Sequence, residues 1–122
     1  MTQPISRVQH GFTDYSYIPL VASAPYLLGF QDNKTATTLS YVLSSNILAS
    51  SLLTRAEWGV FRVLPYKAHL VLDVVTGLTA LSAPWVFGFA KDHKARTAFL
   101  VAGVFGLLAG LLSKPEEMPE YA

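Results

Sequence analysis

Four long apolar stretches constrain the fold of this chain more than any other feature. They cover residues 14–30, 35–54, 68–89 and 95–113. A helix needs about 20 mainly apolar residues to cross the hydrocarbon core of a bilayer. The 122-residue chain is 52% hydrophobic and only 14% charged, whereas soluble domains carry about 25% charged residues. We predict an all-α membrane protein with four transmembrane helices.

Charge, cysteine content and motifs exclude several classes of function. The formal net charge is +1 without a Lys/Arg-rich run, so the sequence predicts no nucleic-acid binding. There is no cysteine, which removes disulfides, thiolate metal sites and cysteine nucleophiles. The first residues do not resemble a secretory signal, so we expect the first apolar stretch to remain in the mature protein. Known catalytic motifs are missing, and we predict a protein that is not an enzyme.

The sequence contains an internal repeat, found by comparing the chain with itself. At an offset of 59 residues, the first half matches the second at His10/His69, Asp14/Asp73, Ser23/Ser82, Ala24/Ala83, Pro25/Pro84, Gly29/Gly88 and Phe30/Phe89. Further on, one inserted residue changes the offset to 60 and aligns Asp32/Asp92, Lys34/Lys94, Thr37/Thr97, Leu48/Leu108, Ala49/Ala109 and Leu52/Leu112. We predict a duplicated two-helix unit.

This duplication predicts the domain organisation and topology. One membrane domain comprises a first repeat (10–54), an interfacial connection (55–67), a second repeat (68–114) and a polar tail (115–122). Each repeat crosses the membrane twice, so a pseudo-twofold axis along the membrane normal should relate the two. Both termini then share a side with the connection. Five Lys/Arg residues lie on that side against four on the other, a slight preference for cytoplasmic termini.

A repeated motif predicts a sharp corner between the helices of each repeat. Proline removes a helical hydrogen bond, a nearby serine can bond the freed carbonyl, and glycine suits a left-handed helix end. Asp32 and Asp92 are the expected N-caps of the following helices. The corner residues are Ser23, Pro25, Tyr26, Gly29 and Phe30, and Ser82, Pro84, Trp85, Gly88 and Phe89.

Small residues in the last stretch predict close helix packing. Ala102, Gly106 and Gly110 recur every fourth residue, which lets another backbone approach. Asn46 and Ser50 take equivalent positions in the second stretch. We expect the two faces to meet across the pseudo-axis, with Asn46 as an interhelical donor; contact with a polar ligand is the alternative.

Two His-x3-Asp pairs are the candidates for chemistry. His10 and Asp14, like His69 and Asp73, are four residues apart and share a helix face. A charge in a bilayer needs a partner. The simplest interpretation is a polar clamp at the helix starts. The alternatives are a divalent metal site, axial haem ligation by the two histidines, and proton transfer. The sequence requires no cofactor.

The stretch from His69 to Phe89 resembles the SPW-repeat family of small bacterial membrane proteins, named for a Ser-Pro-Trp signature. Asp73, Gly77, Gly88 and Phe89 match the family pattern. An alanine separates Ser from Pro in both copies, and the first copy has Tyr26 instead of Trp and Ile18 instead of Gly. The resemblance implies a four-helix protein of the bacterial inner membrane, of unassigned activity.

We therefore expect a non-enzymatic membrane component that accompanies a larger assembly. Its partners would be the lipid bilayer and either other membrane subunits or further copies of itself. A metal- or haem-binding membrane protein is the second hypothesis. A small transporter is disfavoured, because four short helices leave little room for alternating access.

Overall fold

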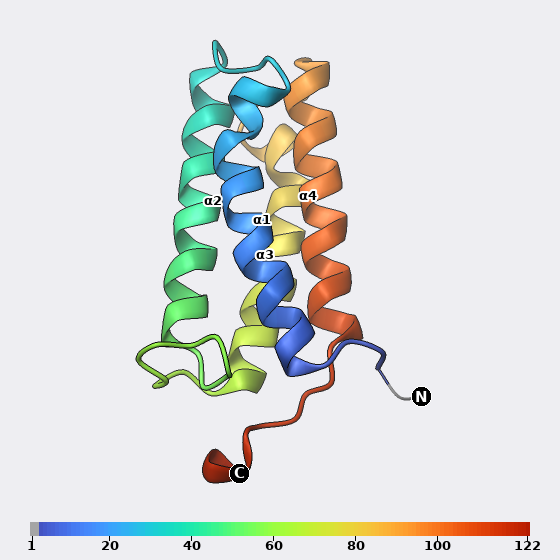
Figure 1. Cartoon of the computed structure of the whole chain (residues 1–122). Helices are drawn as coiled ribbons and strands as arrows, with labels where there is room; N and C mark the ends of the chain where they lie inside the picture. The colour runs from blue at the N-terminus through green and yellow to red at the C-terminus, as the bar shows by residue number, and fades with distance from the viewer. Residues whose placement is uncertain (1–2) are drawn as a thin grey trace.

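The chain forms a bundle of four helices arranged as two antiparallel hairpins. The computed structural model describes residues 3–122. The first hairpin joins α1 (Arg7–Leu27) to α2 (Lys34–Leu53), and the second joins α3 (Tyr66–Val86) to α4 (His93–Leu112). A short 3-10 helix, η1 (Pro119–Tyr121), lies near the C-terminus. Both chain ends and the α2–α3 connection lie at one end of the bundle, and the two short corners lie at the other (Figure 1).

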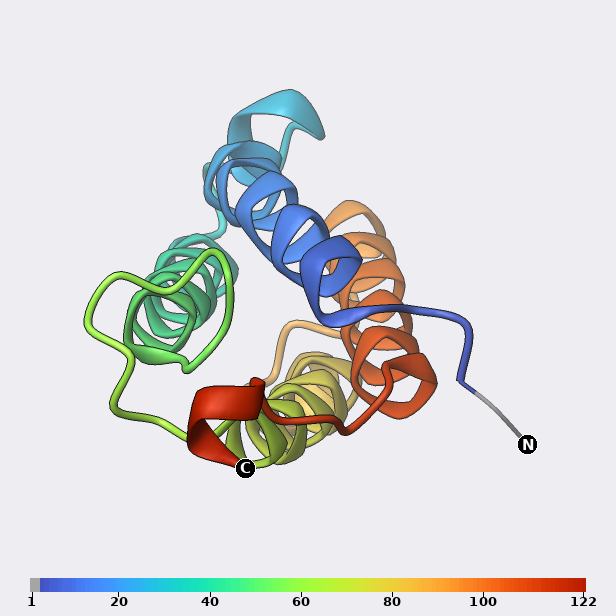
Figure 2. The same ribbon diagram turned by 60° about the horizontal axis from the view of Figure 1, so that its bottom comes forward.

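The helices alternate around the bundle so that the first helix of each hairpin faces the other across a diagonal. Viewed from the terminal end, α1 lies opposite α3 and α2 lies opposite α4 (Figure 2). Each helix packs most extensively on its own hairpin partner, while α1 with α4 and α2 with α3 touch more sparsely. The diagonal between α1 and α3 brings residues far apart in the sequence into the interior.

Helix α1 begins at Arg7, about two turns before the predicted span, which started at residue 14. Ser6 is its N-cap, with the Ser6 hydroxyl accepting from the Gln9 amide and the Gln9 side chain accepting from the Ser6 amide. This reciprocal capping box satisfies two amides that the helix leaves unpaired. The predicted span was bounded by apolar residues, and the first two turns of α1 are too polar to extend an apolar stretch.

The two corners adopt the same turn, as the repeated motif predicts. Gly29 and Gly88 have φ values of 77° and 79°, in the left-handed region that suits glycine. The predicted N-cap Asp92 is confirmed, since its carboxylate accepts from the Ala95 amide. Asp32 was the wrong choice, because the side chain of its neighbour Asn33 caps α2. Asn33 also donates to Asp92 at 3.0 Å, which joins the two corners.

The predicted one-residue insertion between the repeats is wrong, because the second helix of each repeat keeps the offset of the first. Helices α2 and α4 each contain 20 residues, and their bounds differ by 59, like those of α1 and α3. Their N-caps, Asn33 and Asp92, have the same offset. Matches at an offset of 60 involve mostly common leucine, alanine and lysine residues, whereas asparagine and aspartate cap a helix equally well without being identical.

The serines of the corner motif do not bond the carbonyls that the prolines free. Pro25 and Pro84 lie inside the last turns of α1 and α3. A proline frees the carbonyl four residues earlier, which belongs to Val21 or Ala80. The Ser23 hydroxyl instead donates to the carbonyls of Pro19 and Leu20. Ser82 likewise donates to Thr79, so the predicted compensation is wrong in both copies.

The small-residue face of α4 packs on α3, not on α2 as predicted. A Cβ built on Gly77 of α3 would lie 2.7 Å from the Leu107 amide and 2.9 Å from the Gly103 carbonyl. The two backbones therefore touch where both residues are glycine. Asn46 of α2 is exposed and reaches Thr76 of α3 at 3.5 Å. The faces cannot meet because α2 and α4 occupy opposite corners.

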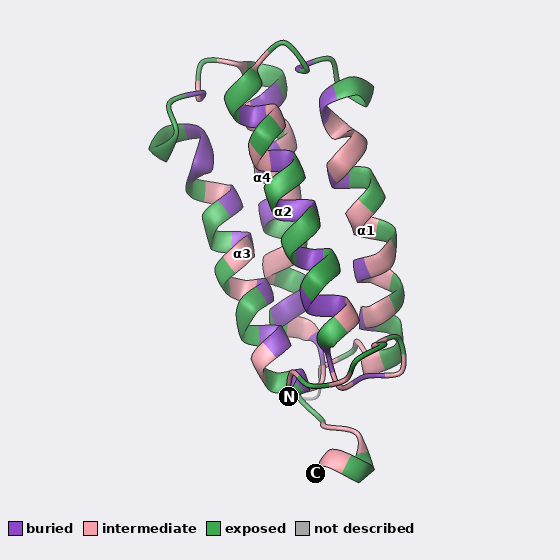
Figure 3. Cartoon of the chain, turned by 90° about the vertical axis from the view of Figure 1, so that its left-hand side faces the viewer, coloured by how far each residue is buried: buried purple, intermediate pink, exposed green. Residues whose placement is uncertain are grey.

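Buried residues follow the inward faces of the helices (Figure 3), where an apolar core that includes Phe30, Leu43 and Phe99 lies beside many polar groups. The buried polar residues are His10, Asp14, Ser40, Ser44, Ser50, Ser51, Thr54, His69, Asp73 and Ser113. The exposed apolar side chains occur on all four helices and include Phe12, Leu20, Val42, Leu48, Val75, Leu78, Val101 and Phe105. Among residues 3–122, two helices, α3 and α4, are long and apolar enough to cross a membrane.

The C-terminal tail and the α2–α3 connection cover the terminal end of the bundle. The Glu117 carboxylate accepts from the Tyr66 and Lys67 amides, which caps the start of α3. Arg7 forms an ion pair with Glu57 at 2.5 Å. The Trp58 indole donates to the Val8 carbonyl at 2.9 Å. These contacts close the bundle over the first turns of α1 and α3.

Candidate metal centre

The two His-x3-Asp pairs come together in the interior, near the terminal end of the bundle. His10 and Asp14 lie on α1, and His69 and Asp73 on α3. Because residues four apart share a helix face, each pair points across the diagonal at the other. All four side chains are buried. We call these four residues the quartet.

The quartet is a closed ring in which nitrogen and oxygen atoms alternate. Nε2 of His10 lies 2.6 Å from Oδ2 of Asp73 and 3.1 Å from Oδ2 of Asp14. Nε2 of His69 lies 2.7 Å from Oδ2 of Asp14 and 3.2 Å from Oδ2 of Asp73. Each carboxylate thus touches both histidines, and each histidine touches both carboxylates.

A second layer of hydroxyl groups fixes the orientation of each imidazole. Nδ1 of His10 lies 2.7 Å from the Ser113 hydroxyl, and Nδ1 of His69 lies 2.7 Å from the Thr54 hydroxyl. Ser113 and Thr54 donate their own protons to helix carbonyls four residues earlier. A hydroxyl has one proton, so each must accept from Nδ1–H. The proton of a neutral imidazole is therefore held on Nδ1.

This tautomer determines what the ring can contain. With Nδ1 protonated, a neutral histidine presents a lone pair at Nε2, and a lone pair cannot bond a carboxylate. Two imidazolium rings would give two positive charges against the two aspartates. A divalent cation between two neutral rings gives the same charge balance. Both states are neutral overall, as a low-dielectric interior requires.

The ring has the composition and spacing of a four-ligand metal site. One ligand atom from each of the four residues can be chosen so that all lie within 4.8 Å of one another. Ligands about 2.1 Å from a common ion are roughly 3 to 3.4 Å apart when adjacent, so the observed contacts would open by a few tenths of an ångström. Imidazole and carboxylate together suit zinc and other divalent first-row metals. A ligating histidine almost always donates its second ring N–H to an acceptor, and the Thr54 and Ser113 hydroxyls provide that acceptor here.

The geometry does not favour haem, the other cofactor considered from the sequence. A bis-histidine haem places its iron and macrocycle between two facing imidazoles. Here the ring centroids are only 5.2 Å apart and the planes meet at 82°. Carboxylate oxygens occupy the space between the rings.

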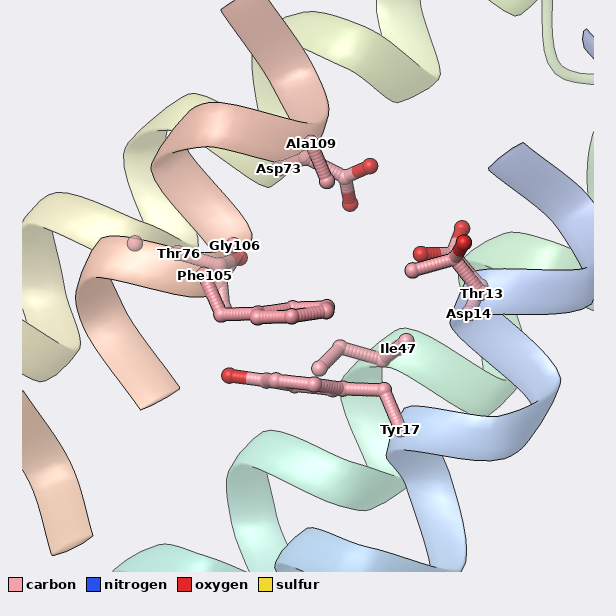
Figure 4. Close-up of a pocket in the computed structure, with 10 residues that line it drawn as sticks. Thr13, Asp14, Tyr17, Ile47, Asp73, Thr76, Phe105, Gly106 and Ala109 are labelled. Atoms are coloured by element: carbon pink, nitrogen blue, oxygen red, sulfur yellow. The ribbon is translucent and has the colours of Figure 1, made fainter. Parts of the chain in front are cut away.

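A small cavity lies on the side of the quartet that faces the corner end of the bundle. Its volume is about 20 Å³, enough for about one water molecule. Asp14 and Asp73 face it from α1 and α3, and the stacked rings of Tyr17 and Phe105 lie below them (Figure 4). A fifth ligand, such as water, could reach an ion at the carboxylates from this cavity.

An unpaired hydroxyl lies on the terminal side. Tyr66 is 1% exposed, and its ring stacks on His69 and meets His10 edge-on. Within residues 3–122, its hydroxyl is the one fully buried side-chain polar atom without a hydrogen-bond partner. A buried polar atom without a hydrogen-bond partner is uncommon in folded proteins, and no contact in the described part of the chain explains this one.

The other predicted residues lie outside the quartet. Tyr26 and Trp85 are exposed at the corner end of the bundle. Thr54, Ser113 and Tyr66 were not predicted from the sequence. Thr54 and Ser113 differ by 59 residues, so a constant offset would have paired them. Nothing in the sequence singled out Tyr66.

Comparison with known proteins supports the resemblance. No curated protein and no solved structure matches the chain. The model of the SPW repeat domain matches residues 10–113, from the first histidine of the quartet to the serine that supports it. Because the match covers most of the 122 residues, the chain belongs to the SPW repeat family.

Proposed function

We propose that this chain is a four-span membrane protein that binds one divalent transition-metal ion in the quartet. The observation that carries the proposal is the closed ring of two Nε2 and two Oδ2 atoms, with four N···O distances of 2.6–3.2 Å. The hydroxyls behind it hold both imidazoles in the tautomer that a metal requires. Zinc is the ion to test first, since it accepts both ligand types in a four-coordinate site.

A membrane span formed by α2 is supported by the placement of its polar residues. Helix α2 is 20 residues long, like α4. Four of its five serines, which lower its hydropathy, are buried. Three of these, Ser40, Ser44 and Ser50, donate to carbonyls of their own helix. Its outer face carries apolar residues such as Val42 and Leu48 together with small polar ones such as Ser45 and Asn46. Such a helix can face lipid despite its composition.

The repeated architecture supports a pseudo-twofold axis along the membrane normal. The quartet would then lie on this axis, with one His-Asp pair and one hydroxyl from each repeat. Both termini and the α2–α3 connection would share one side of the membrane. The family resemblance suggests a bacterial inner membrane as the setting, with the termini in the cytoplasm.

Elemental analysis of the full-length protein tests the metal proposal. Wild type purified in detergent would be stripped with chelator, incubated with zinc, dialysed and measured by inductively coupled plasma mass spectrometry. We expect about one ion per chain. The double variant His10→Ala/His69→Ala should retain none. The matched control is His93→Ala, which removes an exposed histidine at the start of α4.

A second double variant separates ligand loss from misfolding. Asp14→Asn/Asp73→Asn keeps the size of both side chains and removes both negative charges. Circular dichroism would establish that it retains helix. If folded wild type bound no more zinc, manganese, iron or cobalt than this variant, the metal proposal would be wrong.

A metal-free outcome favours the second candidate function, an accessory subunit of a membrane assembly. In that case the quartet is two buried ion pairs that clamp α1 to α3. Little of the chain lies outside the four helices, which leaves few residues to form a functional site outside the membrane. This observation favours the accessory role. Cross-linking in native membranes, followed by mass spectrometry, would identify a neighbouring subunit or a second copy.

A further inference from the structure

An apolar groove runs along the outside of the bundle between α1 and α4. It has a volume of about 660 Å³ and extends from Phe12 to Leu28 on α1. Its walls are almost entirely apolar, and Leu20, Val101 and Phe105 in them are more than half exposed. The groove exists because α1 and α4 belong to different hairpins and touch sparsely.

The corner end of this groove carries a positive charge. Lys94 lies in the first turn of α4 and reaches across to the corner that follows α1, where its Nζ would be 3.4 Å from a Cβ on Gly29. Gly29 directly follows Leu28, which lines the groove, and Thr97, one turn after Lys94, lines the opposite wall. Among residues 3–122, no carboxylate lies within ion-pair distance of this ammonium group.

The surroundings of Lys94 favour an anionic group. Three more basic residues, Lys34, Lys91 and Arg96, lie at the corner end of the bundle, against two acidic residues, Asp32 and Asp92. The Asp92 carboxylate is already engaged by the Asn33 amide and the Ala95 amide. The excess positive charge thus lies beside the end of an apolar groove.

We propose that the α1–α4 groove binds one acyl chain of an anionic phospholipid whose phosphate lies against Lys94. One leaflet covers about 15 Å, or about ten residues of a helix. A chain that starts beside Leu28 therefore occupies the corner half of the groove, along Leu20, Ala24 and Val101. This proposal is independent of the metal site, which lies at the other end of the bundle.

Native mass spectrometry with defined lipids tests the proposal. Full-length protein in detergent would be mixed with dioleoyl phosphatidylglycerol or dioleoyl phosphatidylcholine, which share acyl chains and differ in headgroup charge. Wild type should retain one phosphatidylglycerol in preference to phosphatidylcholine. Lys94→Gln should lower phosphatidylglycerol retention about fivefold, the effect of one lysine beside an anionic headgroup. Retention of phosphatidylcholine should not change.

Two further variants make the result specific. Val101→Trp fills the groove from an exposed position and should lower retention of both lipids. Lys67→Gln removes the same charge from an exposed position at the start of α3, at the other end of the bundle, and should leave retention unchanged. Equal retention of the two lipids by wild type would overturn the proposal, as would equal losses in the two lysine variants. Circular dichroism would establish that Val101→Trp is helical. If this variant then retained both lipids as well as wild type does, the proposed position of the acyl chain would be wrong.

Discussion

His10 makes its shorter contact with Asp73 of the opposite helix and not with Asp14, one turn along its own helix. The distances are 2.6 Å and 3.1 Å. His69 behaves in the same way, at 2.7 Å from Asp14 and 3.2 Å from Asp73. The pairs that share a helix in the sequence therefore exchange partners in the bundle. This exchange joins the two hairpins through buried polar groups.

Breaking one of these exchanged contacts should destabilise the protein strongly. Asp73→Asn leaves His10 facing an amide and makes the charges of the quartet unequal. Removing one partner of a buried ion pair costs about 3–5 kcal/mol. Thermal unfolding in detergent, followed by circular dichroism, would measure the loss.

A double-mutant cycle shows whether the loss of stability comes from the contact between His10 and Asp73. His10→Asn, Asp73→Asn and the double variant would be compared with wild type under the same conditions. The double variant should be less destabilised than the sum of the single variants, because neither partner remains buried alone. Additive losses would mean that the two residues act independently.

The hydroxyls behind the histidines should control metal affinity. Thr54→Val and Ser113→Ala each remove the acceptor that holds Nδ1–H. Loss of such a support typically lowers metal affinity by about 10–100-fold. Competition with a chromogenic zinc chelator would measure the change. Ser23→Ala is the control, because its hydroxyl bonds only to helix carbonyls at the other end of α1; unchanged affinity in both test variants would remove the proposed supporting role.

Two glycines of the second hairpin should respond oppositely to the same substitution. A Cβ on Gly77 would lie 2.7 Å from the backbone of α4, so Gly77→Ala should force α3 and α4 apart at a cost of about 1–3 kcal/mol. A Cβ on Gly106 meets nothing closer than 3.7 Å. Gly106→Ala should be neutral or should stabilise the helix by up to about 1 kcal/mol. Thermal unfolding compares the two, and equal effects would contradict this account of close packing.

The link between the corners should make stability sensitive to acid. The hydrogen bond from Asn33 lowers the pKa of Asp92 below its ordinary value. The folded state therefore favours the charged carboxylate, and this stabilisation is present above the ordinary pKa of about 3.9. It is lost as the pH falls through the lower pKa of the folded state. Unfolding temperatures between pH 6 and 3 should fall less in Asp92→Asn than in wild type, and parallel curves would count against the link.

The sequence was sufficient for the parts of this fold that depend on local chemistry. Four helices follow from apolar length, and both corners follow from Gly29 and Gly88, whose left-handed backbone no larger residue adopts easily. The His-x3-Asp spacing placed each pair on one helix face. Local chemistry also explains the misplaced N-cap, because Asp32 and Asn33 are adjacent and equally able to cap.

The tertiary structure decided which of these local faces meet. It placed α1 opposite α3, which turned two His-x3-Asp pairs into one ring, and it placed α4 against α3, which gave Gly103 the partner Gly77. It also brought Thr54 and Ser113 behind the histidines. None of these relationships is local: the Gly77–Gly103 contact depends on how the two helices of one hairpin pack, and the hydrogen bonds of the ring and its supports depend on how the two hairpins pack. A sequence pattern specifies the face of a helix, and packing selects its partner.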